Sequence, residues 1–343
     1  MTPKPLNSKY LHFGIGVAEN YRRNPKAAAI KATKQAMMNV KGERYMDAYI
    51  QFTRTKKQKY ENIVRTPPYF MLAFVSGAQF INKKPMAGGE IEFVNGLLEA
   101  AGPHIPIFGA GAGSDFEDYL YKNEGKNYQF ANGKVYTNSG IVAFVLSNLY
   151  FENNVLHGYT TTNDFAAVTK LDDSGYEILQ INGKEAIEEY CHLIKVSKVL
   201  YLKDPFKYSL MRPFGLIALD GSAYIKEALP NPDNKSFHST LKLHKNTIMN
   251  VLKYDTKKHL KTMEEVVSRA KNGKKAVALF CNCSTRRLLC KGEANSIQNV
   301  KKKFSLPFIG MYNFSEIGST KTNSAQVHGE TVTSLILYDE LLV

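Results

Sequence analysis

The side chains best suited to chemistry lie toward the C-terminal end of the chain, in three short segments. These segments run from Phe280 to Arg287 (F-C-N-C-S-T-R-R), from Pro307 to Ile317, and from His328 to Thr333 (H-G-E-T-V-T). Each has the pattern of a strand that delivers reactive or charged side chains at or near its end. Three such strands in one sheet would gather a thiol, two guanidiniums, a carboxylate and an imidazole around one concavity. The pattern predicts a ligand site, and it leaves open whether the ligand is sensed or transformed.

The first segment is suited to the acid group of a ligand. Ser284 and Thr285 are good N-cap residues, so the backbone amides near Ser284 are expected to point at an anion. Arg286, in the first turn of the predicted helix, would then clamp a carboxylate. Arg287 points about 100° away around that helix and is expected to be solvated. Glu316 would bind an amine or would pair with Arg286, and both interpretations stay open.

Cys283 is a candidate nucleophile. It would sit at a strand end beside a helix N-terminus, next to Arg286 and near His328, and all of these lower the pKa of a thiol. The alternative is that Cys283 packs in the core, as buried cysteines commonly do. Zinc binding by Cys281, Cys283 and Cys290 is disfavoured, because Cys-x-Cys lacks the usual Cys-x2-Cys knuckle.

A glycine run, Gly109-Ala-Gly111-Ala-Gly113, follows a strand predicted over 105–108. It superficially resembles a phosphate loop. A dinucleotide site needs a helix directly after the last glycine and an acidic residue further along, and neither pattern is present. The run therefore predicts a backbone that must closely approach either the facing lobe or a small ligand.

The composition is that of a globular protein. The chain has 343 residues, of which 44% are hydrophobic and 22% are charged, and this length favours two domains or lobes. No apolar run is long enough to predict a membrane span. The first ten residues lack the pattern of a secretion signal, and the four cysteines do not suggest a disulfide framework. We therefore expect a cytoplasmic protein with no membrane contact.

The net charge of +14 raises the question of nucleic-acid binding. The lysines fall in short, separated runs, such as Lys83-Lys84 and Lys257-Lys258. Such runs are typical of solvated faces or of helix ends, where cations suit the helix dipole. No continuous basic stripe with interleaved aromatics is visible, so nucleic acid is disfavoured as a partner.

Strands and helices alternate irregularly along both halves of the chain. Strands are predicted at 10–17, 48–52, 69–75, 105–108, 128–130, 134–136, 140–146, 155–159, 166–171, 176–181, 215–219, 223–229, 239–243, 247–251, 276–281, 308–314 and 327–338. Helices are predicted at 24–40, 56–64, 88–98, 184–193 and 257–271, and the last of these is expected to carry an apolar stripe of Met263, Val266 and Val267 inward. Asn132-Gly133 predicts a tight hairpin turn. Without strict βαβ alternation, the pattern favours an α+β fold of two lobes, each a mixed, mostly antiparallel sheet packed with helices.

Many of these segments, in this order, resemble the FIST family of two-lobed intracellular signal-transduction domains. In the N-terminal half they are P-H-I-P-I-F-G-A-G-A-G-S-D, F-A-N-G-K-V, G-I-V-A-F, L-H-G-Y, Val168-Thr169 and I-N-G-K-E-A-I-E-E-Y. In the C-terminal half they are R-P-F-G-L, the Cys283–Arg286 unit, Pro307–Ile317 with its G-x-Y-x-x-x-E core, and His328–Thr333. The resemblance covers nearly the whole chain from about Phe13. It implies a FIST N-terminal lobe over 1–182 and a FIST C-terminal lobe over 183–343.

The chain departs from the family pattern in two places. The family usually carries a strand that ends in a glycine-rich G-E loop in its first third. Between Ala36 and Tyr69 there is room for about one strand and one helix, so the first lobe is expected to be shortened. The family's Gly-Glu before the last strands is Ser315-Glu316 here.

The resemblance implies a sensory protein, not an enzyme, in which a small molecule such as an amino acid is the ligand. We expect it to bind a carboxylate-bearing ligand in or near a cleft between the lobes, with lobe closure reporting occupancy. It would signal through a separate protein of the kinase, cyclase or chemotaxis type. The candidate ligand-binding residues are Gly109, Gly111, Gly113, His157, Cys283, Ser284, Arg286, Tyr312, Glu316 and His328.

Three alternatives remain open at this stage. One is amide or ester hydrolysis that depends on Cys283. Another is a gas sensor with haem, a cofactor suggested for some family members, which would place His157 or His328 on iron. The third is a pure interaction scaffold. Apart from the haem alternative, no cofactor or metal is expected.

Overall fold

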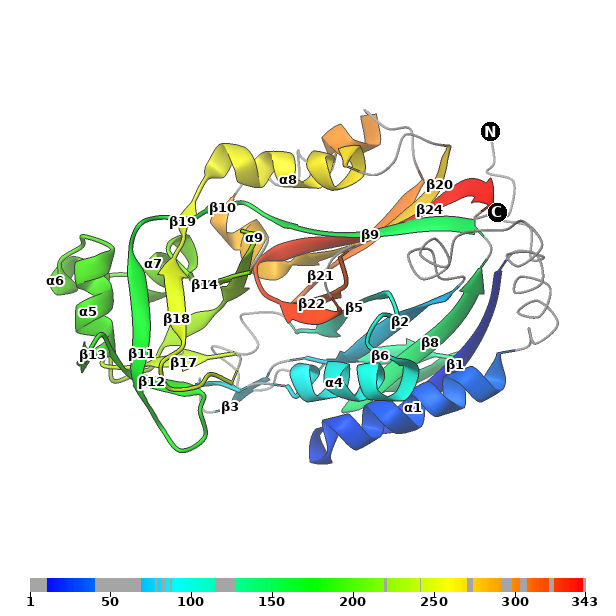
Figure 1. The fold of residues 1–343 in the computed structure, drawn as a ribbon, viewed down its shortest axis with the longest axis horizontal. Coiled ribbons are helices and arrows are strands. Elements are labelled where there is room, and N and C mark those ends of the chain that lie inside the picture. The colour runs from blue at the N-terminus through cyan, green and yellow to red at the C-terminus, as the bar shows by residue number, and fades with distance from the viewer. Residues whose placement is uncertain are drawn as a thin grey trace.

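The computed structural model shows an α+β fold of two lobes, which confirms the predicted fold class (Figure 1). It describes residues 11–40, 69–77, 79–81, 84–86, 88–114, 127–147, 149–218, 221–240, 242–269, 274–290, 298–302, 307–320 and 324–341. The strand predicted at 48–52, the helix predicted at 56–64 and the expected shortening of the first lobe lie outside these residues.

A six-stranded sheet, in the order β1-β8-β2-β5-β22-β23, is the lower of the two stacked sheets in Figure 1. Its strands are β1 (Leu11–Glu19), β2 (Tyr69–Ser76), β5 (Ile107–Ala112), β8 (Ser139–Ser147), β22 (Ser315–Gly318) and β23 (Gln326–His328). Helices α1 (Pro25–Asn39) and α4 (Glu90–Ala101) cover its outer face. Helix α1 begins where the Asn24 side chain accepts a hydrogen bond from the Ala27 amide at 3.0 Å, as the Asn-Pro sequence predicts.

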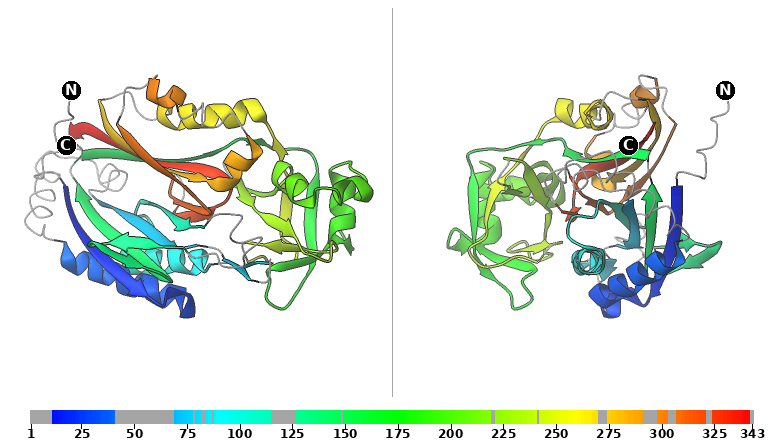
Figure 2. Two further views of the ribbon diagram at one scale, coloured as in Figure 1. Left: turned by 180° about the vertical axis from the view of Figure 1, so that it is seen from behind. Right: turned by 45° about the vertical axis from the view of Figure 1, so that its right-hand side comes forward.

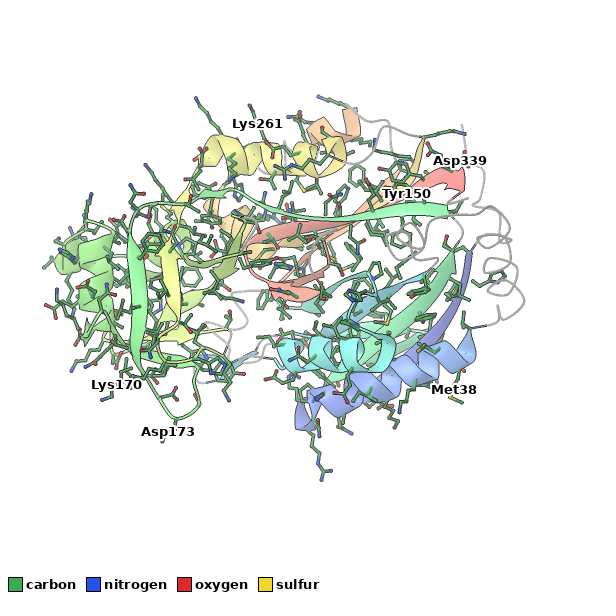
Figure 3. All side chains as sticks on the ribbon, viewed as in Figure 1. Met38, Tyr150, Lys170, Asp173, Lys261 and Asp339 are labelled. Carbon is green, nitrogen blue, oxygen red and sulfur yellow. The ribbon has the colours of Figure 1, made fainter. Side chains whose placement is uncertain are left out.

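A four-stranded sheet, in the order β21-β20-β24-β9, packs on the inner face of the first. Its strands are β9 (Leu149–His157), β20 (Lys275–Cys283), β21 (Phe308–Asn313) and β24 (Thr331–Leu341). Side chains fill the space between the two sheets (Figure 3), among them Phe70, Phe108 and Leu335. Helix α8 (Thr256–Ser268) covers the outer face of this sheet with the predicted apolar stripe of Met263, Val266 and Val267. Together these elements form four layers, helix, sheet, sheet and helix.

The middle of the chain forms a second unit beside the four layers (Figure 2). Its sheet has the order β15-β14-β18-β11-β12-β17-β16, with β13 paired to β12. The strands are β11 (Phe165–Leu171), β12 (Glu177–Ile181), β13 (Lys184–Glu185), β14 (Phe214–Ile217), β15 (Ala223–Lys226), β16 (Ala228–Pro230), β17 (Phe237–Ser239) and β18 (Ile248–Val251). The helices are α5 (Ala186–Leu193), α6 (Lys198–Tyr201) and α7 (Pro205–Met211). The boundary expected at residue 182 falls inside this unit.

The smaller elements complete the description. Strands β3 (Gln79–Ile81) and β4 (Lys84–Met86) pair with each other, as do β6 (Gln129–Ala131) and β7 (Lys134–Tyr136), and β10 (Tyr159–Thr160) and β19 (Lys253–Tyr254). The remaining short helices are η2 (Tyr21–Arg23), α9 (Ser284–Leu289) and a helical segment at 298–302. The turn between β6 and β7 has positive φ at Asn132 and Gly133, which confirms the predicted hairpin.

The two halves of the chain exchange strands. From the C-terminal half, β22 pairs with β5 and extends the six-stranded sheet. From the N-terminal half, β9 pairs with β24 and forms an edge of the four-stranded sheet. Each sheet therefore holds strands from both halves, and separating the halves would break both ladders of backbone hydrogen bonds.

The structure differs from the sequence predictions in several places. The strand predicted at 223–229 is divided into β15 and β16, and the described part of the strand predicted at 239–243 is present only at Ser239, where β17 ends. The strand predicted to end at Phe108 continues through the glycine run as β5, because these glycines pair with β2 and β22. His328 ends β23 rather than opening the last strand, because Gly329 and Glu330 form a turn before β24, with φ 54° at Glu330. Helices α6 and α7 were not predicted, since both are too short to show an apolar period.

A membrane-spanning helix was not expected. Among the helices that the structure describes, none is long and apolar enough to cross a bilayer.

The glycine at 109 gives a test of the sheet packing. A β-carbon at Gly109 would lie 1.8 Å from the carbonyl oxygen of Ala73 on β2. We therefore expect Gly109→Ala to lower the free energy of unfolding by roughly 1–3 kcal/mol or more. Gly310→Ala is the matched control, since its β-carbon would lie 3.2 Å from the Phe280 side chain. Urea denaturation measures both, and a loss at Gly109 no larger than at Gly310 would contradict this packing.

Candidate functional site

A cavity of about 440 Å³ lies where the four-layered unit meets the second unit. It is lined by β9 and β10, by the turn before β15, by α8, and by residues around the β23–β24 turn. The lining residues that matter for chemistry are His157, Thr160, Ser222, Tyr224, Lys258, Glu265, Arg269, Thr320, His328 and Thr331. Two candidates from the sequence, His157 and His328, are thus brought together in one wall.

His157 is held as a neutral ring. Its Nδ1 accepts a hydrogen bond from the backbone amide of Tyr159 at 3.2 Å, so its Nε2–H donates to the carbonyl oxygen of Ala223 at 3.0 Å. Burial, together with the charge of Lys258, lowers the pKa of His157 to about 4. The glycine that follows it is required by packing, because a β-carbon at Gly158 would lie 2.6 Å from His259 of α8.

His328 is also neutral at physiological pH. Its ring is 4% exposed and stacks on Tyr224, with the ring centroids 5.6 Å apart. Its Nε2 lies 3.3 Å from the carbonyl oxygen of Gly318. Burial lowers the pKa of His328 to about 4, and the positive charge of Lys226 acts in the same direction. The two histidines therefore offer hydrogen-bonding edges and not charge.

Charge at the cavity comes from helix α8. The ammonium group of Lys258 donates to the carbonyl oxygen of Tyr159. Glu265 lies about two turns further along the helix and Arg269 about three turns. These two side chains form an ion pair at 3.7 Å. Lys258 and Arg269 therefore bring two positive charges to the cavity wall, and Glu265 brings one negative charge.

Arg286 lies behind the cavity and is fully buried, at 0% exposure. Its Nε donates to the Asn282 side chain at 2.8 Å, and its Nη2 donates to the backbone carbonyl of His259 at 3.1 Å. These bonds tie helix α8 to the end of β20. The expected role of Arg286 as a clamp for a ligand carboxylate does not fit this position, because α8 covers its guanidinium.

Glu316 is likewise 0% exposed. One carboxyl oxygen accepts from the side-chain amide of Asn313, and the other accepts from the Thr331 amide at 3.1 Å and the Thr331 hydroxyl at 2.7 Å. Burial raises the pKa of Glu316 to about 8, although the bonds from Thr331 and the charge of Arg286 oppose this rise. Thr331 also lines the cavity. Glu316 therefore reaches the cavity wall through Thr331, and it does not contact a ligand directly as the sequence suggested.

The environment of Cys283 is opposite to that of a nucleophile. The side chain is 1% exposed, and its Sγ lies 2.9 Å from the hydroxyl of Thr285. Burial raises the pKa of the thiol well above its ordinary value, and the carboxyl groups of Glu316 and Glu227 add to the rise. The structure therefore favours the packing role for Cys283. The hydrolase alternative is disfavoured, because it requires a thiolate at this position near neutral pH.

Ser284 does not cap the helix that follows β20. The capping residue of α9 is Cys283, which makes no side-chain capping bond, and α9 has only six residues. The hydroxyl of Ser284 is buried without a hydrogen-bond partner among the described residues. This short helix does not offer the anion site that the Ser-Thr pair predicted.

The remaining sequence candidates lie away from the cavity. Tyr312 is 38% exposed on β21, where the guanidinium of Arg287 stacks over its ring at 5.6 Å from the centroid. The glycine run approaches protein rather than ligand. A β-carbon would lie 2.3 Å from the Ser315 hydroxyl if placed at Gly111, and 2.3 Å from the Phe314 ring if placed at Gly113.

The sequence pointed to the neighbourhood of the cavity but not to most of its lining. Lys258 belongs to a lysine pair that was interpreted as solvated, and Tyr224 lies in a strand with no motif. Thr331 lies within the H-G-E-T-V-T segment, and its hydroxyl could have been considered as a hydrogen-bond donor. Each was missed because its role depends on contacts between elements far apart in the chain.

A bound haem would need His157 or His328 as its iron ligand. Both ring nitrogens of His157 already take part in hydrogen bonds, so iron would displace one of them. His328 is almost fully buried and stacked on Tyr224. The described residues therefore do not fit a haem at either histidine. Among these residues, no group of three or more His, Cys, Asp or Glu is arranged to hold a metal ion.

The raised pKa of Glu316 predicts how stability depends on pH. Because the folded state holds this proton up to about pH 8 and the unfolded state releases it near pH 4.5, stability from this group falls as pH rises between those values. We expect wild type to lose stability relative to Glu316→Gln by up to about 1.4 kcal/mol per pH unit. Urea denaturation of both proteins from pH 5 to pH 9 measures the difference, and a constant difference would contradict the burial of an uncharged Glu316.

Comparison with known proteins shows a match to two domains of one family. The FIST N domain matches residues 5–184, and the FIST C domain matches residues 186–319. The uncharacterized protein MJ1623 of Methanocaldococcus jannaschii is 22% identical over 195 residues, which cover 54% of this chain. The chain spans only 36% of the length of that relative. FIST domains are associated with signal transduction, and small-ligand sensing has been proposed for them. With both domains matched in order over most of its length, the chain belongs to the FIST family.

Proposed function

We propose that this protein is a sensor that binds a small carboxylate-bearing ligand, such as an amino acid, in the cavity between its two units. The observation that carries the proposal is the composition of the cavity wall. His157 of β9 and Lys258 of α8 come from the four-layered unit, and Ser222 and Tyr224 come from the second unit, at the start of β15. A ligand in this cavity would contact both units at once, as a receptor that reads occupancy requires.

The acid group of the ligand is assigned to Lys258. Its ammonium group donates one hydrogen bond to Tyr159 and has three donors in all, so it can bind a carboxylate while it remains anchored. Arg269 adds a second positive charge, offset in part by Glu265. The neutral rings of His157 and His328 would orient the rest of the ligand through hydrogen bonds. Arg286, the residue first expected in this role, instead holds α8 in position.

The exchanged strands restrict which movement of the protein can transmit ligand binding to a partner. Closure of one FIST half on the other would break the pairing of β22 with β5 or of β9 with β24. We therefore assign the response to the junction of the two units, where β15, α8 and the β23–β24 turn meet around the cavity. A partner of the kinase, cyclase or chemotaxis type would read this junction.

Thermal-shift measurements with amino acids and other small carboxylic acids test the proposal. A ligand at one hundred times its Kd should stabilise the wild-type protein by about 2.7 kcal/mol. Lys258→Met should remove this stabilisation, because the carboxylate loses its cation, and Lys258→Arg should retain part of it. Lys261→Met is the matched control, since Lys261 is an exposed lysine on the same helix and projects away from the molecule (Figure 3).

Two results would contradict the proposal. One is the absence of any stabilising acid at millimolar concentration. The other is a ligand whose stabilisation is the same in Lys258→Met as in wild type, or is lost equally in Lys261→Met.

A further inference from the structure

We propose that Glu316 and Glu227, buried behind the cavity, form a proton switch that sets the state of the cavity wall through Thr331 and His328. The inference rests on the proposed function only for the identity of the ligand. The coupling between the buried acids and the wall is a property of the protein alone, and it can be measured without a ligand.

The link from Glu316 to the wall is made of two residues. Thr331 lines the cavity and gives both its backbone amide and its hydroxyl to one carboxyl oxygen of Glu316. His328 also lines the cavity and lies directly opposite Glu316 in the pairing of β22 with β23. Directly paired residues of antiparallel strands point to the same face. A change of charge at Glu316 therefore acts on two wall residues at once.

Glu227 lies on the other side of the turn that joins these residues. It is 9% exposed, and a β-carbon at Gly329 would lie 3.7 Å from the Glu227 side chain. Its charge raises the pKa of Glu316. Burial alone raises the pKa of Glu227 to about 7.

Opposing influences place the proton equilibrium near neutral pH. Hydrogen bonds from Asn313 and Thr331 and the positive charge of Arg286 favour the carboxylate form of Glu316. Burial and the nearby Glu227 favour the protonated form, and the balance gives a pKa of about 8. Loss of the proton would strengthen the two bonds from Thr331, because hydrogen bonds to a charged acceptor are stronger.

One other ionisable group near the pair titrates in this range, since burial lowers the pKa of Lys226, on β15 beside Glu227, to about 8, and its charge acts on His328. Glu316→Gln leaves Lys226 in place, so a change caused by Lys226 would persist in that variant. Cys281 and Cys283 on β20 have pKa values raised well above the ordinary value, and His328 on β23 has a pKa of about 4. Arg286 on α9 stays charged. Glu330, in the turn before β24, has its pKa raised well above the ordinary value by burial. On β5, the residues paired with β22 are glycine, alanine and phenylalanine. On the opposite side of β22, Glu90 of α4 lies 3.3 Å from the Ser315 hydroxyl, and burial raises its pKa.

The switch gives ligand binding a definite pH dependence. An anion in the cavity makes the loss of the proton from Glu316 or Glu227 less favourable, so its binding is accompanied by proton uptake. By reciprocity, a carboxylate binds more tightly as the pH falls from 9 to 6. A cationic ligand would show the opposite dependence.

Histidine NMR of the protein without ligand tests the switch. The Cε1–H resonance of His328, identified as the one missing in His328→Gln, should shift between pH 6 and pH 9 with a midpoint near 8, although the ring itself does not titrate there. Glu316→Gln should reduce this shift to the smaller contributions of Glu227 and Lys226. Glu227→Gln should move the midpoint to lower pH, and it keeps the test decisive if Glu316→Gln does not fold. Glu99→Gln, an exposed carboxylate paired with Lys26, should leave the midpoint unchanged.

A resonance that stays constant from pH 6 to pH 9, or a shift that persists unchanged in both Glu316→Gln and Glu227→Gln, would overturn the switch. Thermal shifts with acetate, the simplest carboxylate, test the proposed function separately. We expect acetate to stabilise wild type more at pH 6 than at pH 9, and we expect this difference to be smaller in Glu316→Gln, which keeps only the Glu227 proton. Stabilisation by acetate that rises with pH would overturn the predicted coupling. Absence of stabilisation at every pH, with a normal His328 titration, would count against the proposed function and not against the switch.

Discussion

The structure depends on two places where the C-terminal chain crosses from one sheet to the other. The first crossing follows β21 of the four-stranded sheet, where Phe314 separates it from β22 of the six-stranded sheet. The backbone amide of Phe314 donates to the carbonyl oxygen of Gly111 at 3.1 Å, and the Asn313 side chain donates to the carbonyl oxygen of Ser315 at 2.9 Å. The second crossing is the turn at Gly329 and Glu330, which returns the chain to the four-stranded sheet as β24. Two of the segments that mark the family are these crossings.

The crossings explain why polar groups are buried where two hydrophobic sheets meet. At a crossing the backbone leaves one ladder before it joins the next, so side chains must satisfy donors and acceptors that no strand reaches. Glu316 does this for the amide and hydroxyl of Thr331, and Asn313 does it for the carbonyl oxygen of Ser315. Because the polar groups buried here are sealed from water, the charges among them influence one another strongly. The residues that line the cavity beside them are affected by the same charges.

Local patterns in the sequence were sufficient for much of the fold. The alternation of apolar residues located most of the described strands, Asn132-Gly133 located a hairpin, and the stripe of Met263, Val266 and Val267 located the buried face of α8. The exchange of β9 and β22 between the sheets could not be predicted, because strand pairing between distant segments leaves no local signal. The site was predicted only in part for the same reason. His157 and His328 do line the cavity, whereas Arg286 and Glu316 lie behind it, since whether a charged side chain is exposed depends on which helix packs over it.

The proposed ligand is a small acid bound at Lys258, between the four-layered unit and the second unit. A crystal structure of the protein with the acid that stabilises it most is the decisive experiment. We expect ligand density in the cavity, with a carboxylate oxygen within hydrogen-bonding distance of the Lys258 ammonium group and the ligand in contact with His157 or His328. Density at another place on the protein, with the cavity holding only water, would contradict this proposal.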